Sequence, residues 1–188
     1  KTLFPYTTLF RSDLWVWGDN TYKSLGDGTT ISKSSPIQIT STITWAVMAE
    51  GHQSTHGVKD DGTLWAWGSN DFGQLGNGTV TSTNSPIQIG NLTTWSKIST
   101  GYGGTCAIKT DGTLWAWGIN DFGQLGQGNI IYRSSPVQIG NLTTWNKVSS
   151  GQYTTMFLKT DGTIWGCGYN AAGTLGDGTN TNRSSPVQ

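Results

Sequence analysis

The sequence repeats itself every 50 residues, and no other feature constrains the fold as strongly. All tryptophans fall into three series with this spacing: Trp15, Trp65, Trp115 and Trp165; Trp45, Trp95 and Trp145; and Trp17, Trp67 and Trp117. Cys167 takes the next place in the third series. Pro36, Pro86, Pro136 and Pro186 keep the same spacing, as do Leu25, Leu75, Leu125 and Leu175. Such periodicity indicates an architecture of stacked units, each too small to bury its own apolar face.

Each repeat contains four short segments with the pattern of a β-strand. In the repeat that begins at Trp95, we expect strands over residues 95–99, 105–109, 113–117 and 137–139, the last directly after Pro136. A long loop, residues 118–135, separates the third strand from the fourth, and no segment has a helical period.

Asp111-Gly112 favours a two-residue type I′ hairpin between the second and third strands. That turn would pair Ile108 with Trp115 and Cys106 with Trp117. The corresponding pairs elsewhere are Val58–Trp65, His56–Trp67, Leu158–Trp165 and Met156–Cys167. The last pair would set a long side chain against a small one and so keep the volume of the layer.

A single four-stranded sheet cannot cover tryptophans that each bury about 150–250 Å². Sheets stacked face to face around an axis can, and this arrangement is a β-propeller. We therefore predict an all-β fold, a partial propeller of about 3.5 four-stranded blades. The expected segments are a partial blade over 13–44 and blades over 45–94, 95–144 and 145–188, with both ends of the chain cut inside a repeat.

Residues 1–12 do not follow the repeat. Thr2 to Ser12 reads as the translation of a sequencing-adapter oligonucleotide, so we interpret Lys1–Ser12 as a non-native leader. Without it, nine basic residues stand against eleven acidic ones, and the basic residues are scattered. Nucleic-acid binding needs a basic stripe, so we expect no nucleic-acid partner. The longest apolar run, Trp45–Ala49, is too short to cross a bilayer, so we expect no membrane insertion.

The repeated motifs resemble those of the RCC1 (regulator of chromosome condensation) family, in a bacterial or phage-like form. They are DGTLWAWG, NDFGQLG, SPVQI and WxKVSSG, found in full over residues 111–151. The resemblance implies a propeller of seven blades, each with four antiparallel strands. Two features depart from the family pattern: Ser54, Gly104 and Thr154 stand where a histidine is common, and the first repeat has Lys23-Ser24-Leu25-Gly26 in place of GQLG.

Few residues suggest catalysis or metal binding. His52 and His56 are the only histidines, and other repeats place unrelated residues at their positions, so we expect one exposed and one packed histidine. Asp61, Asp111 and Asp161 are expected to be turn residues. Cys106 and Cys167 lie 61 positions apart without a CxxC pattern, which favours neither a zinc site nor a disulfide framework. We expect no enzyme activity, no catalytic residue, no metal and no cofactor.

The loops suggest where a ligand would bind. Loops after the first and third strands of a blade open on one face, and these vary between repeats, whereas the turns on the other face hardly change. Loops on a rigid scaffold commonly carry recognition, and Tyr and Arg are frequent interface anchors. The candidate binding residues are therefore Tyr102, Tyr132, Arg133, Tyr153, His52 and Gln152. The alternative is that these loop positions vary because nothing constrains them.

The function hypothesis is a non-enzymatic interaction module for a protein or a surface glycan. Low charge with much Thr, Asn, Ser and Gly favours an extracellular or virion-associated protein. One alternative is a guanine-nucleotide exchange or chromatin regulator like the family's namesake, which uses a wedge inserted in the propeller. Another is a propeller enzyme, such as a glycan lyase or hydrolase, with its site in further blades.

Overall fold

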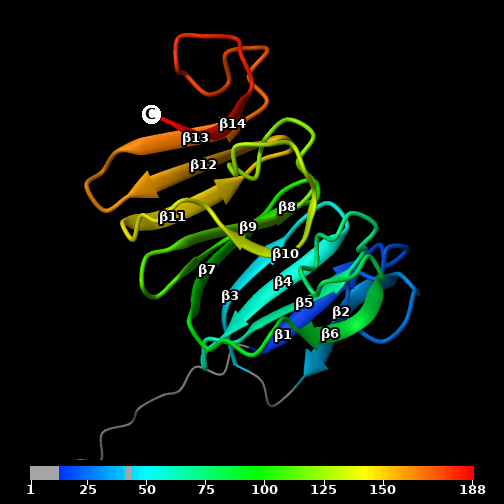
Figure 1. Ribbon diagram of the computed structural model, residues 1–188. Coiled ribbons are helices and arrows are strands. Elements are labelled where there is room, and N and C mark those ends of the chain that lie inside the picture. The colour runs from blue at the N-terminus through cyan, green and yellow to red at the C-terminus, as the bar shows by residue number, and fades with distance from the viewer. Residues whose placement is uncertain (1–12, 41–43) are drawn as a thin grey trace, which may run out of the picture.

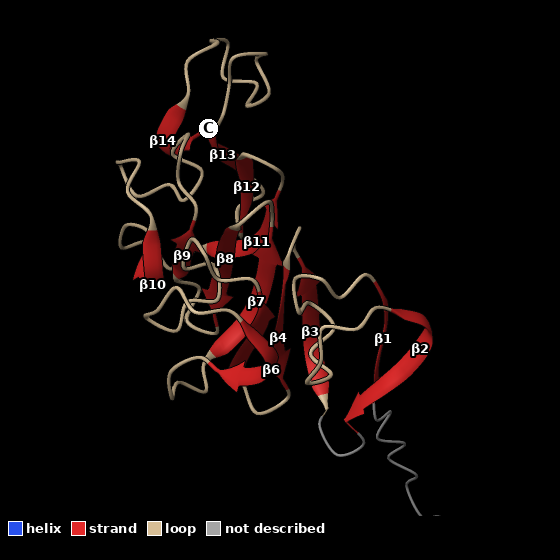
Figure 2. Cartoon of the chain, turned by 90° about the vertical axis from the view of Figure 1, so that its right-hand side faces the viewer, coloured by secondary structure: helices blue, strands red, loops and turns tan. Residues whose placement is uncertain are grey.

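The computed structural model describes residues 13–40 and 44–188, which form fourteen β-strands and no helix (Figures 1 and 2). The predicted leader, Lys1–Ser12, lies outside the described residues. No helix in the described part of the chain has the length and apolar character to span a membrane.

The strands form one two-stranded and three four-stranded antiparallel sheets. The strands of the first three sheets are β1 (Leu14–Gly18) and β2 (Lys33–Thr40); β3 (Trp45–Glu50), β4 (Ser54–Lys59), β5 (Leu64–Gly68) and β6 (Thr83–Gln88); and β7 (Trp95–Thr100), β8 (Gly104–Lys109), β9 (Leu114–Gly118) and β10 (Arg133–Gln138). The fourth contains β11 (Trp145–Ser150), β12 (Thr154–Lys159), β13 (Ile164–Gly168) and β14 (Arg183–Val187). In each sheet, strands that are consecutive in sequence are neighbours.

The sheets follow one another along an open arc, from the blue and cyan strands through green to the orange strands in Figure 1. The first strands of neighbouring sheets, β3, β7 and β11, lie side by side. This arrangement confirms the predicted all-β, partial-propeller fold.

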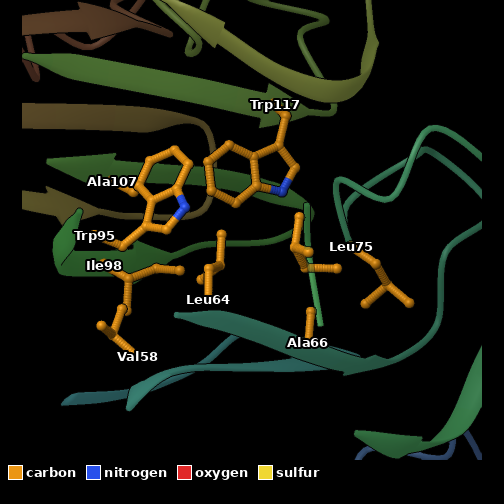
Figure 3. Packing of buried hydrophobic residues seen from close by; sticks show 9 residues of the cluster. Val58, Leu64, Ala66, Leu75, Trp95, Ile98, Ala107 and Trp117 are labelled. Atoms are coloured by element: carbon orange, nitrogen blue, oxygen red, sulfur yellow. The ribbon is translucent and has the colours of Figure 1, made fainter. Parts of the chain in front are cut away.

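The core lies between the sheets, as the tryptophan spacing predicts. Trp67 and Trp117 are fully buried, and in Figure 3 Trp95 and Trp117 lie over Leu64 and Ala66 of the preceding sheet. The Trp117 indole Nε1 donates to the carbonyl oxygen of Gln74, one repeat earlier, at 2.9 Å. Trp67 makes the same bond to Ser24 at 2.8 Å. These two junctions therefore combine apolar burial with a hydrogen bond that fixes the position of the indole. At the third junction, Cys167 Sγ takes the place of the indole and bonds to Gln124 O at 3.3 Å.

The hairpin register predicted from Asp-Gly is wrong by one residue. Ile108 pairs with Leu114 and Thr105 with Trp117. Lys109 N donates to Thr113 O at 3.1 Å and Gly112 N donates to Lys109 O at 3.0 Å, which closes a three-residue loop. Among described residues other than glycine only Lys23 has a positive φ, so Asp111 cannot form a type I′ turn. The loop is instead a turn followed by Gly112 at φ 78°, in the manner of a G1 bulge.

The predicted pairing of Met156 with Cys167, and the volume argument based on it, is wrong for the same reason. Met156 pairs with Gly166, whereas Cys167 pairs with Thr155. A Cβ on Gly166 would lie 2.8 Å from Met156 Sδ. Met156 therefore fills the space over a glycine rather than the space beside Cys167.

The fourth strand also begins earlier than predicted. β10 starts at Arg133 and contains Pro136, whereas the sequence predicts a strand after this proline. Its pairing with β9 shifts register between Arg133 and Val137. An edge strand with such an irregularity tolerates a proline, because no ladder hydrogen bond is required there.

The long loop between the third and fourth strands is held by one buried asparagine. The Asn70 Nδ2 donates to the carbonyl oxygens of Thr79 at 3.0 Å and Thr81 at 3.2 Å. Its Oδ1 accepts from Leu75 N at 2.9 Å. Asn20, Asn120 and Asn170 are likewise fully buried at the corresponding positions. These asparagines fix the loops that carry part of the candidate site.

Candidate functional site

The loops after the first and third strands meet at one end of each sheet. Ile119 N, just after β9, donates to the carbonyl oxygen of Gly103, just after β7, at 2.9 Å. Ser69 N to Gln53 O and Tyr169 N to Tyr153 O repeat this bond in the neighbouring sheets, both at 2.8 Å. The two variable loop sets therefore form one continuous surface, as the strand order predicts.

Glycines let the loops after the first strands approach one another. His52 N donates to Gly101 O at 3.3 Å, across a sheet junction. A Cβ on Gly51 would lie 2.8 Å from Gly101 O, and one on Gly101 would lie 2.0 Å from Gly151 O. Because no other side chain fits there, the residues that follow each glycine, His52, Tyr102 and Gln152, become neighbours.

An uninterrupted series of aromatic rings crosses three sheets on this surface. The His52 and Tyr102 rings contact each other at a tilt of 38° with centroids 4.6 Å apart, and Tyr102 meets Tyr153 edge-on at 5.7 Å. Phe122 contacts Tyr153 at 5.0 Å and Tyr169 at 5.2 Å. We call these five residues the aromatic row. Rings in edge contact hold one another in place, so the row is a preformed apolar surface with polar tips.

A shallow cavity of about 280 Å³ lies beside one end of the row. His52, Tyr102 and Gln152 line it together with Glu50 and the glycines of the loops. His52 and Gln152 are exposed, and Tyr102 keeps 39% of its surface accessible. Four of the six predicted binding residues, His52, Tyr102, Gln152 and Tyr153, are thus brought together.

In the described part of the chain, neither Tyr132 nor Arg133 forms a ring contact or a hydrogen bond with a residue of the aromatic row. The Tyr132 ring packs on Phe72 at 5.9 Å, and its hydroxyl donates to the Asp121 carboxylate, which raises the Tyr132 pKa to about 12. Arg133 Nε donates to Gln127 Oε1 at 3.1 Å. In two other repeats ion pairs occupy this place: Lys33–Asp27 at 3.1 Å and Arg183–Asp177 at 2.7 Å. In each of these three repeats, a basic side chain bonds to the residue six positions earlier and so closes the loop. This six-residue spacing is the sequence signal for a residue that stabilises the loop.

Phe122 and Tyr169 belong to the row although the sequence analysis did not select them. Both lie in the loops after the third strands, in the part nearest to the strand. The selection by variation considered only the later part of those loops. The sequence signals for these residues are the tyrosine directly after Gly168 and the phenylalanine of the Asp-Phe-Gly motif.

The histidines and cysteines, considered above for catalysis or metal binding, do not form a reactive or metal-binding group in the described residues. His56 is fully buried, its Nε2 donates to Gln74 O at 2.9 Å, and burial lowers its pKa to about 4. His52 is exposed, so the expected division between the two histidines is confirmed. Burial raises the pKa of the Cys106 thiol to about 12. The described residues contain no group of three or more His, Cys, Asp or Glu able to hold a metal ion.

The turn aspartates serve the hairpins. The Asp111 carboxylate accepts from Thr113 N at 2.9 Å and from Thr113 Oγ1 at 2.7 Å, and these hydrogen bonds lower its pKa. Asp61 and Asp161 repeat the arrangement. The Asp177 carboxylate accepts hydrogen bonds from Arg183 Nε at 2.7 Å and from Thr179 Oγ1 at 2.8 Å.

Comparison with known proteins gives a family and a fold. Residues 12–56, 61–108 and 111–158 match a family model described as the regulator of chromosome condensation (RCC1) repeat, and residues 95–124 and 145–174 match a second model with the same description. No curated protein matches the sequence.

Solved structures resemble the chain over most of its length. Human WBSCR16 has 20% sequence identity and a TM-score of 0.85, with 95% of this chain and 48% of that protein covered. Prp20p from Saccharomyces cerevisiae has 18% identity and a TM-score of 0.80, with 93% and 45% covered. Yeast RCC1 (Prp20) in complex with Kap60 has 19% identity and a TM-score of 0.75, with the same coverage. The chain spans about half the length of these proteins, and at this identity the likeness shows the fold alone.

Proposed function

The chain belongs to the RCC1 repeat family, and from this premise we propose that it is a non-enzymatic protein-interaction module that binds its partner through the aromatic row. The observation that carries the proposal is the run of ring contacts from His52 to Tyr169 across three sheets. The low charge of the chain supports an extracellular or virion-associated role.

The chemistry of the row suits a protein partner. Aromatic residues are enriched in binding hot spots because they bury large areas at a small cost in side-chain entropy. The rings are held by mutual contacts and by glycine-dependent loop approach, so little ordering is needed on binding. Tyr102 and Tyr153 carry hydroxyls that can recognise backbone groups of a peptide.

Relatives support protein binding as the general role. The solved Prp20p structure is described together with its binding to Gsp1p and histones, and yeast RCC1 (Prp20) was solved bound to Kap60. These partners belong to those proteins. For this chain they serve as defined probes of the exchange-factor and chromatin alternative.

The test selects peptide ligands directly, so the partner need not be identified first. A phage-displayed library of random peptides is panned against the full chain, and the affinity of selected peptides is measured for Tyr102→Ala, Tyr153→Ala and the control Ile164→Ala. Ile164 is 59% exposed at the start of β13, next to the Asp161 turn, and makes an apolar control outside the aromatic row. We expect at least a roughly tenfold loss with each tyrosine variant and none with the control.

Two outcomes would contradict the proposal. Selected peptides that bind the tyrosine variants as tightly as the parent chain would show that the row is not the preferred site. Tight binding of purified Gsp1p or histones that both tyrosine variants leave unchanged would favour the exchange or chromatin alternative instead.

A further inference from the structure

Two cavities of matching composition lie at successive sheet junctions. The cavity of about 460 Å³ is lined by Asn91, Leu92, Trp95, Trp115 and Pro136, among others. The cavity of about 620 Å³ contains the counterpart of every one of its lining residues, 50 positions later in the sequence. We call these the first and second junction cavities. Both volumes lie in the range of about 300–1,000 Å³ that small-molecule sites occupy.

The junction cavities share no lining residue with the aromatic row. They extend along the fourth strands, between the turns that follow those strands and the loop residues 76–77 and 126–129. Trp95 begins β7, whose other end leads to Tyr102, and its backbone N donates to Gly62 O of an Asp-Gly-Thr turn at 3.1 Å. Trp145 N bonds to Gly112 O in the same way at 3.2 Å. A ligand in these cavities would therefore not compete for the row.

Each cavity is lined by an asparagine and a leucine whose side chains are exposed to solvent. Leu92 and Leu142 are both 44% exposed. Asn91 and Asn141 are exposed, and within residues 13–40 and 44–188 neither side chain forms a hydrogen bond. By contrast, Asn70 and Asn170 are buried and fully bonded. A single exposed leucine is ordinary, but the same Asn-Leu pair at two equivalent cavities points to a shared ligand.

The lining favours an uncharged ligand. No ionisable side chain lines the first cavity, and only Arg133 lines the second, where its Nε already bonds to Gln127. Lys109 and Lys159 lie over the rings of Trp115 and Trp165, with Nζ 3.7 and 3.8 Å from the ring centroids, so their charges are already engaged with the indoles. The apolar part consists of leucine, proline, isoleucine and tryptophan carbons. The polar part consists of amides and glycine backbone, which both donate and accept hydrogen bonds. A sugar ring has this combination of an apolar C–H face and an edge of hydroxyls.

We propose that the two junction cavities bind uncharged sugar rings, one in each cavity, as successive units of a glycan. The equal spacing of the cavities along the arc makes the chain suited to a repetitive polymer, because the second ring then binds intramolecularly. This inference goes beyond the proposed protein-binding function and uses a different surface.

The experiment observes each cavity separately by NMR. The full ¹⁵N-labelled chain is titrated with methyl β-D-glucopyranoside, methyl β-D-galactopyranoside and methyl N-acetyl-β-D-glucosaminide. The indole N–H signals of Trp115 and Trp165 report on the first and second cavities. We expect saturable shifts of both signals with at least one glycoside.

Each cavity provides the control for the other. Leu92→Ala should weaken binding reported by Trp115 about fivefold and leave the Trp165 response unchanged, and Leu142→Ala should do the reverse. Tyr102→Ala should alter neither response. Since Tyr102 belongs to the row, these results are independent of the peptide selection above.

Three results would overturn the assignment. The first is the absence of a saturable shift with any of the three glycosides up to their solubility. The second is a response that neither leucine variant changes. The third is saturable binding of a proline-rich peptide in place of the sugars, which would identify the cavities as peptide grooves.

Discussion

Three of the four glycines at one repeat position provide a graded test of the sheet junction. Gly76, Gly126 and Gly176 have similar positive φ values of 78°, 69° and 71°. An added Cβ would lie 2.6 Å from Trp117 Nε1 at Gly76 and 3.3 Å from Cys167 Sγ at Gly126, and would meet nothing within 4 Å at Gly176. Replacement by alanine therefore adds the same backbone strain at all three positions, with decreasing steric conflict.

The expected loss of stability follows that order. Gly176→Ala should cost about 1 kcal/mol, the penalty for a left-handed alanine. Gly126→Ala should cost slightly more. Gly76→Ala should cost about 3 kcal/mol, because overpacking adds about 1–3 kcal/mol. The indole of Trp117 cannot move aside without losing its 2.9 Å bond to Gln74 O.

Urea unfolding followed by tryptophan fluorescence measures these differences in the free energy of unfolding. The double variant Gly76→Ala/Trp117→Cys places the added methyl group beside a cysteine, as Gly126→Ala does beside Cys167, so its cost should be less than the sum of the single variants. Equal destabilisation by Gly76→Ala and Gly176→Ala, or additivity in the double variant, would refute the role assigned to the indole contact.

Three further predictions concern His56, the thiols and Trp17. Because burial lowers the His56 pKa from 6.5 to about 4, the unfolded chain binds more protons between these values, so stability should fall as pH falls from 6.5 to 4, by about 3 kcal/mol in total. Urea titrations across this window should lose that slope in His56→Gln, and an unchanged slope would contradict the assignment. Cys106 and Cys167 are buried with raised pKa values, so 5,5′-dithiobis(2-nitrobenzoate) should react with them only after unfolding; rapid reaction of the native chain would be inconsistent with this packing. Trp17 is 60% exposed whereas Trp67 is buried, so sedimentation velocity should show concentration-dependent association that Trp17→Ser reduces; equal association of both chains would exclude this surface.

The candidate site could be predicted only in part. Variation between repeats selected His52, Tyr102, Gln152 and Tyr153, which lie together because Gly51 and Gly101 allow close loop contact. The same criterion selected Arg133, whose Nε bonds within its own loop. It passed over Phe122, which joins Tyr153 to Tyr169. Variation identifies exposed loop positions, but contacts between loops of different repeats depend on the distance between sheets.

The sequence by itself determined the architecture. The 50-residue spacing of tryptophan, proline and leucine predicts stacked four-stranded sheets, since a unit of this size cannot bury two large indoles alone. Trp67 and Trp117 occupy the junctions as this reasoning requires. The spacing predicts the fold well because the tryptophans of every repeat need a neighbouring sheet to bury them.

The tertiary structure decided the register, the ring contacts and the cavities. Asp111-Gly112 is compatible with two hairpin loops, and the three-residue loop lets Thr105 Oγ1 and Trp117 Nε1 both donate to the carbonyl of Gln74 in the preceding sheet. That choice depends on a partner 31 or 43 residues away in sequence. The aromatic row and the junction cavities likewise arise between repeats. Their geometry is set by how closely two sheets approach, which no single repeat encodes.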